Sequence, residues 1–392
     1  MIALPLHFEF IIKPVGALCN MRCDYCYYLS KRDLYQGGPA RMPDEVLRAF
    51  TQAYLQTCQS REVVFAWQGG EPTLAGVDFF ERALRYQERF APPDVRVRNV
   101  LQTNGTRIDD RWCAFLRRHD FLVGLSLDGP KHLHDAHRRS ARGGSTFHQT
   151  LRALRLLQAH GVEFNILATV NASNVEKPLE VYRFLRDDLG VRFMQFIPIL
   201  ARGEGSGEGG QPRLSAESVT GEAYGRFLIA VFDEWVRRDV GKVFVQAFDL
   251  ALGAWLGAPS GLCVFSPTCG RALVLERSGD VYSCDHFVDR EHFLGNILDR
   301  PLHEMVNSPP QLEFGHSKAT KLPRVCRECR VRFACNGGCP KDRFFVSADG
   351  EAGLNALCDG YRRFFEHVDE PMRRMAKLLR QGKSPSLIIK EY

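Results

Sequence analysis

Residues 19–28 read CNMRCDYCYY, and three of these residues are cysteines: Cys19, Cys23 and Cys26. Three thiolates this close together can each bind one iron of a four-iron cluster. The fourth iron then lacks a protein ligand, much as a catalytic metal keeps an open position for its substrate. Zinc ribbons usually pair one C-x2-C element with another, and no such partner lies nearby. Because three cysteines in eight residues rarely arise by chance, this stretch favours an open metal cluster over buried structural thiols.

The first 200 residues alternate between strand-like and helix-like patterns. The predicted strands are Phe8–Lys13, Val63–Trp67, Arg98–Thr103, Leu122–Ser126, Phe164–Val170 and Phe193–Ile197. The predicted helices are Pro43–Thr57, Asp78–Phe90, Asp110–His119, Phe147–His160 and Pro178–Leu189. This alternation predicts an α/β fold with a parallel sheet and right-handed crossovers. Six such units suit an open barrel whose chemistry gathers at the C-terminal ends of the strands.

Polar and glycine-rich turns follow several of these predicted strands. They are QGGEP from Gln68, QTNG from Gln102, SLDG from Ser126 and PIL from Pro198. Any one of them could be ordinary turn chemistry, because Gly, Asn and Asp are common after strands. Together with the cysteine loop, they indicate one cofactor site along a shared rim.

The composition changes after residue 200. Ala201–Arg213 is rich in glycine and predicts a flexible loop or linker, and Ser215–Arg238 follows as a helix with an apolar stripe. The domain boundaries predicted from this change are 1–200 for the barrel and 201–258 for the linker and helical segment. Residues 259–392 then form a cysteine-rich domain with a C-terminal helix.

The C-terminal third carries eight more cysteines, enough for two four-cysteine sites. They are Cys263, Cys269, Cys284, Cys326, Cys329, Cys335, Cys339 and Cys358. Their spacing does not show which four belong together, and C-x2-C is also the usual element of zinc ribbons. The upstream cysteine loop tips the interpretation toward iron–sulfur clusters, which can carry electrons where zinc cannot. Cys58 and Cys113 lie in helical patterns and are interpreted as packing residues.

Composition and charge exclude several classes of protein. The net charge is +6 over 392 residues, with no dense Lys/Arg run interleaved with aromatics, so we expect no nucleic-acid partner. No stretch reaches the length of a transmembrane helix, and the N-terminus lacks the features of a signal peptide. Thirteen cysteines without export signals indicate metal chemistry in a reducing compartment, so we expect a cytoplasmic protein.

The cysteine loop resembles the signature of radical S-adenosylmethionine (radical SAM) enzymes, and the later cysteines resemble the SPASM domain. Within that group, the chain is most similar to the anaerobic sulfatase-maturating enzymes. The motifs that carry this similarity are CNMRCDYCYY, QGGEPTL, QTNGT, SLDGP, QFIPIL, YSCDHFV and CRECRVRFACNGGCPKDR. The resemblance implies a partial (β/α)6 radical SAM barrel followed by a SPASM domain with two auxiliary clusters. It also implies three [4Fe-4S] clusters and S-adenosyl-L-methionine as cofactors.

The resemblance implies roles for single residues. Those expected to bind the cofactor are Tyr25, Gly70, Ser126, Arg138 and Leu200, and Gln68 is expected to contact the substrate peptide. One auxiliary cluster would use Cys263, Cys269, Cys284 and Cys339. The other would use Cys326, Cys329, Cys335 and Cys358. Asp285, directly after Cys284, matches the family's proton acceptor, although a lone loop Asp is otherwise more often a surface or capping residue.

The implied reaction is the oxidation of a Cys or Ser residue in a sulfatase to Cα-formylglycine. A radical derived from the cofactor would abstract hydrogen from the β-carbon, and Asp285 would take the side-chain proton. The implied partners are a sulfatase polypeptide with a Cys/Ser-x-Pro-x-Arg segment and a reduced flavodoxin- or ferredoxin-type electron donor.

Two alternatives stay open at this point. One is a SPASM maturase that cross-links or epimerises a ribosomally made peptide. Such enzymes often carry an N-terminal leader-recognition domain, for which the strand predicted from Phe8 leaves no room. The other alternative is a zinc-binding interaction protein without enzymatic activity.

Overall fold

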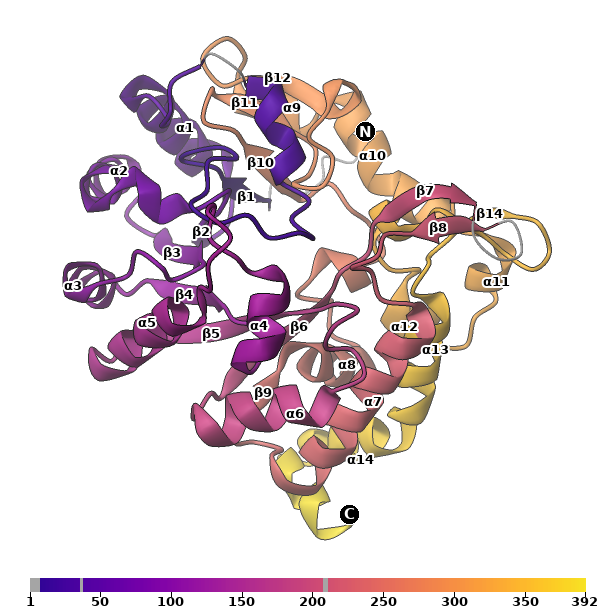
Figure 1. The fold of residues 1–392 in the computed structure, drawn as a ribbon. Helices are drawn as coiled ribbons and strands as arrows, with labels where there is room; N and C mark the ends of the chain where they lie inside the picture. The colour runs from indigo at the N-terminus through magenta and orange to yellow at the C-terminus, as the bar shows by residue number, and fades with distance from the viewer. Residues whose placement is uncertain (1–7, 36–37, 207–210) are drawn as a thin grey trace. The chain divides into compact units, whose positions relative to one another are not determined.

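The computed structural model describes residues 8–35, 38–206 and 211–392 (Figure 1). These residues form two compact units. The first takes in the described residues of Met1–Ser126, Arg138–Phe164 and Cys269–His316; the second is made of Leu127–His137, Asn165–Thr268 and Ser317–Tyr392. Each unit combines segments that lie far apart in the sequence, whereas the domain boundaries predicted above are consecutive. Those boundaries remain a prediction.

The first unit is organised around a mostly parallel sheet. Strands β1 (Glu9–Ile12), β2 (Glu62–Trp67), β3 (Arg96–Thr103) and β4 (Leu122–Ser126) pair in parallel and in chain order. On the other side of β1 lies β10 (Ala272–Leu275), also parallel to it. The antiparallel strands β11 (Asp280–Tyr282) and β12 (Phe293–Asn296) continue the sheet beyond β10. A segment from the last third of the chain is therefore paired with the first strand.

Helices accompany this sheet, and most of them bury an apolar face. The helices of the first unit are α1 (Asp44–Thr57), α2 (Val77–Phe90), α3 (Asp110–Arg118), α5 (Phe147–Ala159) and α9 (Leu302–Val306), with α10 (Pro309–Thr320) running into the second unit. In Figure 1, α1, α2 and α3 lie in a row on the outer side of β1 to β3. A cluster of fully buried aromatic rings packs within this unit, with edge-on, tilted and stacked contacts. It contains Phe10, Phe50, Tyr54 and Phe65.

The second unit contains the other predicted barrel strands. Strands β5 (Phe164–Val170), β6 (Phe193–Pro198) and β9 (Phe244–Val245) pair in parallel. Its helices are α4 (Lys131–His137), α6 (Pro178–Arg183), α7 (Gly221–Arg238), α8 (Gln246–Leu256), α11 (Arg324–Arg327), α12 (Arg332–Cys335), α13 (Cys358–His367) and α14 (Asp369–Arg380). Helices α7 and α13 cross at glycines: a Cβ on Gly225 would lie 2.6 Å from the Cα of Gly360. Only glycine permits so close an approach of the two backbones.

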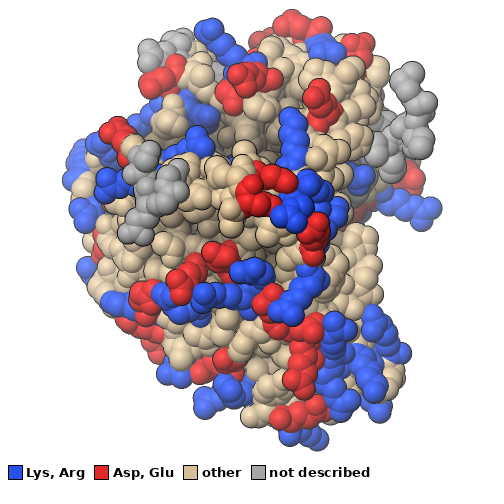
Figure 2. Space-filling model, turned by 90° about the vertical axis from the view of Figure 1, so that its right-hand side faces the viewer, with Lys and Arg blue, Asp and Glu red and all other residues tan. Residues whose placement is uncertain are grey.

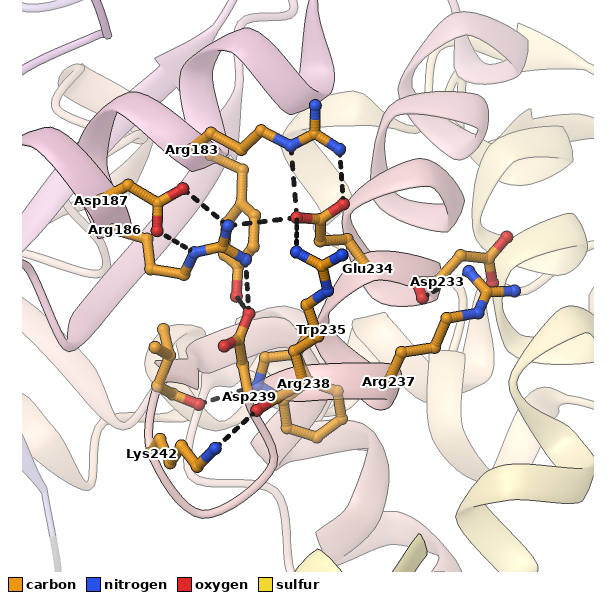
Figure 3. A network of polar contacts seen from close by, with 12 residues as sticks. Arg183, Arg186, Asp187, Asp233, Glu234, Trp235, Arg237, Arg238, Asp239 and Lys242 are labelled. Carbon is orange, nitrogen blue, oxygen red and sulfur yellow. Dashed lines mark hydrogen bonds and ion pairs between the residues drawn. The ribbon is translucent and has the colours of Figure 1, made fainter. Parts of the chain in front are cut away.

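An arginine-centred network joins α6 and the π-helical turn Phe184–Asp188 to α7 (Figure 3). The guanidinium of Arg186 lies 2.7 Å from Asp239 and 3.1 Å from Glu234, and Arg183 bonds Glu234 at 2.7 Å. The bond from Arg183 holds the pKa of Glu234 below its usual range. Because the carboxylates are shared between several donors, the network fixes the irregular end of α6 against α7.

The sequence predicted most elements of the first 200 residues, but two predictions after residue 200 are wrong. The helix predicted from Ser215 begins at Gly221, because the side chain of Thr220 accepts a hydrogen bond from the Ala223 amide and caps it. The predicted linker contains two antiparallel strands, β7 (Arg202–Ser206) and β8 (Pro212–Leu214). Residues 207–210 of that linker lie outside the described residues.

Two more short strands, β13 (Phe345–Val346) and β14 (Ala352–Leu354), form a hairpin in the second unit. On the face drawn in Figure 2, basic and acidic side chains are interspersed with one another. None of the helices in the described part of the chain combines the length and the apolar character that crossing a bilayer requires.

Candidate functional site: a cysteine loop and a buried carboxylate

The cysteine loop, residues 19–28, follows β1 in the first unit and is tied down by its backbone. The Arg22 amide donates to the Arg139 carbonyl at 2.8 Å, and Met21 and Ser140 form an isolated antiparallel bridge. The segment around residue 139 therefore lies along the loop. This contact brings Arg138 beside the loop, and its guanidinium is 5.6 Å from the ring centre of Tyr25. The structure thus places together two residues that the sequence predicted to bind the cofactor.

The end of β3 also supports the loop. The Asn104 side chain donates to Asn20 at 3.0 Å, and Asn20 donates to Thr106 at 2.7 Å. The Asn104 side chain also approaches the sulfur of Cys19 at 3.8 Å, and the Met21 amide donates to that sulfur at 3.3 Å. Donors aimed at sulfur stabilise a thiolate, the form that binds metal.

Burial acts against the ionisation of this cysteine. It raises the pKa of Cys19 to about 11, because the thiolate would lose its hydration, and the Met21 amide only partly offsets this. A cationic metal centre removes that penalty, since a coordinating thiol is deprotonated outright. Cys19 also interacts electrostatically with Cys26, and the Cys26 amide donates to the Cys23 carbonyl at 3.1 Å. This donor set suits a metal cluster.

Glu71 of the QGGEP turn was not assigned a role from the sequence. Its carboxylate is 1% exposed and accepts from the Thr73 amide at 3.0 Å, the Thr103 hydroxyl at 2.7 Å and the Asn104 amide at 2.8 Å. Burial raises the pKa of Glu71, and these hydrogen bonds oppose the rise. The carboxylate therefore joins the ends of β2 and β3, the same strand ends that support the cysteine loop. An acidic residue after two glycines was the signal that could have identified it.

Gly70 lies against residues 16–18, which lead into the cysteine loop, with no room for a side chain. Its amide donates to the Gly16 carbonyl at 2.8 Å, and a Cβ there would lie 2.0 Å from the Leu18 carbonyl oxygen. Glycine is therefore required for residues 16–18 to pack on this turn. This packing requirement does not test the contact between Gly70 and the cofactor, which remains a prediction.

We expect Gly70→Ala to destabilise the protein by about 3 kcal/mol, the upper part of the range for overpacking, because the backbone of Ala17 and Leu18 must move. Thermal unfolding and the iron content of the reconstituted protein would measure the effect. Gly253→Ala is the matched control, since no heavy atom lies within 4 Å of its added Cβ. Equal unfolding temperatures for Gly70→Ala and wild type would contradict the expectation.

The other predicted cofactor and substrate residues lie at strand ends. Gln68 follows β2, and its amide donates to the Ile12 carbonyl at 2.9 Å; Ser126 is the buried last residue of β4 in the same sheet. Leu200 follows β6 in the second unit. The roles of these residues remain predictions.

Asp285, the predicted proton acceptor, is buried in the first unit between two donors. Its side chain is 9% exposed; the ammonium of Lys13 lies 2.5 Å from Oδ1, and the hydroxyl of Tyr27 donates to Oδ2. Burial alone would raise the pKa of Asp285, but the charge of Lys13 and the two hydrogen bonds outweigh it and hold that pKa below its usual value. Asp285 is therefore a carboxylate at neutral pH. Its role as the proton acceptor remains a prediction.

A second buried carboxylate lies beside this pair. Lys13 is 1% exposed, and its ammonium is 4.4 Å from the ring centre of Tyr28, whose hydroxyl donates to the fully buried Glu276. Burial raises the pKa of Glu276 to about 7, against the influence of Tyr28 and Lys13. No role for Lys13 or Glu276 is predicted from the sequence. A charged residue that ends the apolar strand FEFIIK was the only signal for Lys13.

In the second unit, four cysteines line one pocket. Cys326, Cys329, Cys335 and Cys358 share a cavity of about 440 Å³. A hydrogen bond from Cys358 lowers the pKa of Cys326 to about 7, whereas burial raises the pKa of Cys335 to about 12. Four thiols around one cavity are the donor set of a [4Fe-4S] cluster, so these residues fit the cluster predicted for them.

The other predicted auxiliary ligands are divided between the units. Cys263 and Cys339 lie in the second unit and interact electrostatically, and burial raises the pKa of Cys339 to about 12. Cys269 and Cys284 belong to the first unit. Their assignment to one cluster remains a prediction. Cys113 is fully buried in α3 and Cys58 is buried at the end of α1.

Two family models match the chain. The radical SAM superfamily model matches residues 14–185, and the SPASM iron-sulfur cluster-binding domain model matches residues 263–330. These matches and the cysteine loop define a radical SAM protein with a C-terminal SPASM domain, which confirms the predicted fold class.

Similarity to individual proteins defines the family more narrowly than the two family models do. It is 43% identical to the serine-type anaerobic sulfatase-maturating enzyme of Bacteroides thetaiotaomicron, over 97% of this chain and 94% of the relative. It is 35% identical to the cysteine-type enzyme of Clostridium perfringens, over 91% of this chain and 95% of the relative. The solved structure of native anSMEcpe with bound AdoMet and Kp18Cys peptide superimposes with a TM-score of 0.85 at 34% identity, over 94% of this chain and 99% of that chain. The chain belongs to the family of anaerobic sulfatase-maturating enzymes.

Proposed function

We propose that this protein oxidises a Cys or Ser residue of a sulfatase to Cα-formylglycine, with Asp285 as the base. The observation that carries the proposal is the buried Asp285 carboxylate, which Lys13 and Tyr27 hold directly beside Cys284. Serine-type and cysteine-type relatives, and a related structure with a bound peptide, support a polypeptide substrate.

The first requirement of the reaction is a radical that removes hydrogen from the β-carbon. S-adenosyl-L-methionine supplies that radical when it is bound at a reduced cluster, which Cys19, Cys23 and Cys26 would hold. The residues proposed to bind the cofactor are Tyr25, Gly70, Ser126, Arg138 and Leu200. Gln68 would contact the substrate peptide.

The second requirement is removal of the proton from the side-chain thiol or hydroxyl. Asp285 is suited to this because it is ionised, and because Lys13 and Tyr27 fix both of its oxygens. Each carboxylate oxygen has a further lone pair, so Asp285 can accept a proton while both contacts persist. Lys13 would keep the site close to neutral before the transfer.

The third requirement is a path for the second electron. We propose two auxiliary [4Fe-4S] clusters, one held by Cys326, Cys329, Cys335 and Cys358 and the other by Cys263, Cys269, Cys284 and Cys339. With the radical SAM cluster, the total would be three. A reduced flavodoxin- or ferredoxin-type protein in the cytoplasm would supply the first electron.

A matched set of peptides tests the reaction. We expect a Cys-x-Pro-x-Arg peptide to lose SH and H and gain one oxygen, because water hydrolyses the oxidised C=S group and sulfide leaves. We expect a Ser-x-Pro-x-Arg peptide to lose two hydrogens. Anaerobic incubation with reductant and cofactor, followed by mass spectrometry and aldehyde labelling, would measure both products. An Ala-x-Pro-x-Arg peptide is the control, because it has no side-chain thiol or hydroxyl to deprotonate. A thioether ring or an epimer, with no aldehyde on either peptide, would support the peptide-maturase alternative instead.

A further inference from the structure

Glu276 is a second buried carboxyl group beside Lys13, and the proposed reaction does not use it. It directly follows β10, as Lys13 directly follows β1, and these two strands pair in parallel with Ile12 opposite Leu275. The Lys13 amide donates to the Leu275 carbonyl at 2.9 Å, so the pairing continues to the ends of both strands. The Lys13 and Glu276 side chains therefore leave neighbouring strands next to each other, within the first unit.

Tyr28 connects Glu276 to Lys13. Its hydroxyl donates to Oε1 of Glu276, and the Lys13 ammonium lies over its ring, 4.4 Å from the ring centre. A cation over the face of an aromatic ring is attracted to it, most strongly where water is excluded. The same ammonium lies 2.5 Å from Oδ1 of Asp285. A continuous series of contacts therefore runs from Glu276 through Tyr28 and Lys13 to the proposed base.

The balance of charge in this cluster favours a neutral Glu276. Glu276 is 0% exposed and Lys13 is 1% exposed, and a buried charge is costly unless it is paired. One ammonium serves two carboxyl groups, and Asp285 is in contact with it. Oε2 of Glu276 is buried without a hydrogen-bond partner among the described residues, a loss that is smaller for a neutral oxygen than for a charged one.

The groups that face Glu276 act in both directions on its ionisation. Burial raises the pKa of Glu276 to about 7, and the charge of Asp285 contributes to the rise. The Tyr28 hydrogen bond and the charges of Lys13 and of the partly exposed Arg277 oppose it. The neutral form of Glu276 therefore predominates below pH 7, in agreement with the balance of charge.

We propose that Glu276 is a positioning residue that acts as a neutral acid: it fixes Tyr28, and through Tyr28 it keeps the Lys13 ammonium directed at Asp285. A neutral carboxyl group accepts the Tyr28 hydrogen bond through its carbonyl oxygen. An ionised Glu276 would instead compete with Asp285 for the ammonium, because opposite charges attract strongly where water is excluded. This inference rests on the proposed role of Asp285 as the base.

Three variants of the full chain separate the neutral acid from the charge and from the hydrogen bond. Glu276→Gln keeps an oxygen that accepts from Tyr28 but cannot ionise, Glu276→Leu removes the acceptor, and Tyr28→Phe removes the donor of the same bond. Glu88→Leu is the control, because Glu88 is an exposed glutamate of α2. Formylglycine and 5′-deoxyadenosine are measured in one anaerobic reaction below pH 7, with iron content and thermal unfolding of each variant.

We expect Glu276→Leu and Tyr28→Phe to lower the rate of formylglycine formation about five- to tenfold, the effect of one lost hydrogen bond. Production of 5′-deoxyadenosine should fall less, and Glu276→Gln should restore most of the rate that Glu276→Leu loses. Adding Glu276→Leu to Lys13→Gln should cause little further loss, because Glu276 acts through Lys13. The infrared difference between wild type and Glu276→Gln should contain the C=O stretch of a neutral carboxylic acid.

Each contrary outcome is distinct. A Glu276→Gln variant as slow as Glu276→Leu, or no C=O stretch of a neutral acid, would show that the ionised form is required or present and overturn the inference. Wild-type formylglycine rates in Tyr28→Phe and Glu276→Leu would also overturn it. Equal loss of both products, or effects of Glu276→Leu and Lys13→Gln that multiply, would show a purely structural role. A wild-type rate in Asp285→Asn would instead refute the proposed base, and the inference with it.

Discussion

Asp285→Asn should lower the rate of formylglycine formation by about 10²–10⁴-fold, the range for loss of a general base. Asparagine keeps the shape of the side chain, but its amide cannot take the proton from the substrate thiol or hydroxyl. Lys13 would also lose the carboxylate that it contacts at 2.5 Å. Cleavage of S-adenosyl-L-methionine should suffer less, because the three cysteines proposed to hold its cluster are unchanged.

Measuring 5′-deoxyadenosine and formylglycine in the same anaerobic reaction separates these two steps. Asp289→Asn is the matched control: Asp289 lies four residues further along, is more exposed, and caps the turn that begins at Arg290. Asparagine also caps helices well, so this variant should behave like wild type. Equal rates and yields of formylglycine in Asp285→Asn and wild type would remove Asp285 from the mechanism.

Replacing any one of Cys19, Cys23 and Cys26 with Ala should abolish cleavage of S-adenosyl-L-methionine. Each thiolate would bind an iron for which the loop offers no other thiol. The auxiliary iron should remain, because Cys326, Cys329, Cys335 and Cys358 line a separate pocket in the second unit. Iron analysis and the yield of 5′-deoxyadenosine after reduction would measure the two effects together.

Cys113→Ala is the control for this series. Cys113 is fully buried in α3 and was interpreted as a packing residue, so its loss should affect stability but neither iron content nor cofactor cleavage. Near wild-type production of 5′-deoxyadenosine by any of the three loop variants would contradict the assignment of the radical SAM cluster.

The sequence predicted the regular part of the fold because local periodicity dominates there. The six strands of the first 200 residues lie within two residues of their predicted bounds, and α3, α5 and α1 begin within one residue of theirs. Apolar runs of four to eight residues between amphipathic helices are readily assigned as strands rather than helices. The strands within the predicted linker were missed because Gly203 allows its strand to approach Leu214 closely. The composition of the segment does not reveal this pairing.

Strands β10, β11 and β12 were missed because they have only three or four residues each and lie among cysteines. Their sheet position depends on the parallel pairing of β1 with β10, in which Ile12 faces Leu275. A contact between residues so distant in the chain leaves no periodic signal near either strand. Local reasoning could therefore not add the C-terminal segment to the first sheet.

By itself, the sequence determined the chemical groups available to this protein: the cysteines, their spacing and the polar turns after the strands. Through resemblance it also predicted Asp285 as the base. Only the tertiary structure decided which groups surround the Asp285 carboxylate. The pairing of β1 with β10 brings Lys13 and Glu276 together, and the cysteine loop adds Tyr27 and Tyr28. Whether a carboxylate is ionised depends on its burial and on charges within a few ångströms, and both are properties of the folded chain.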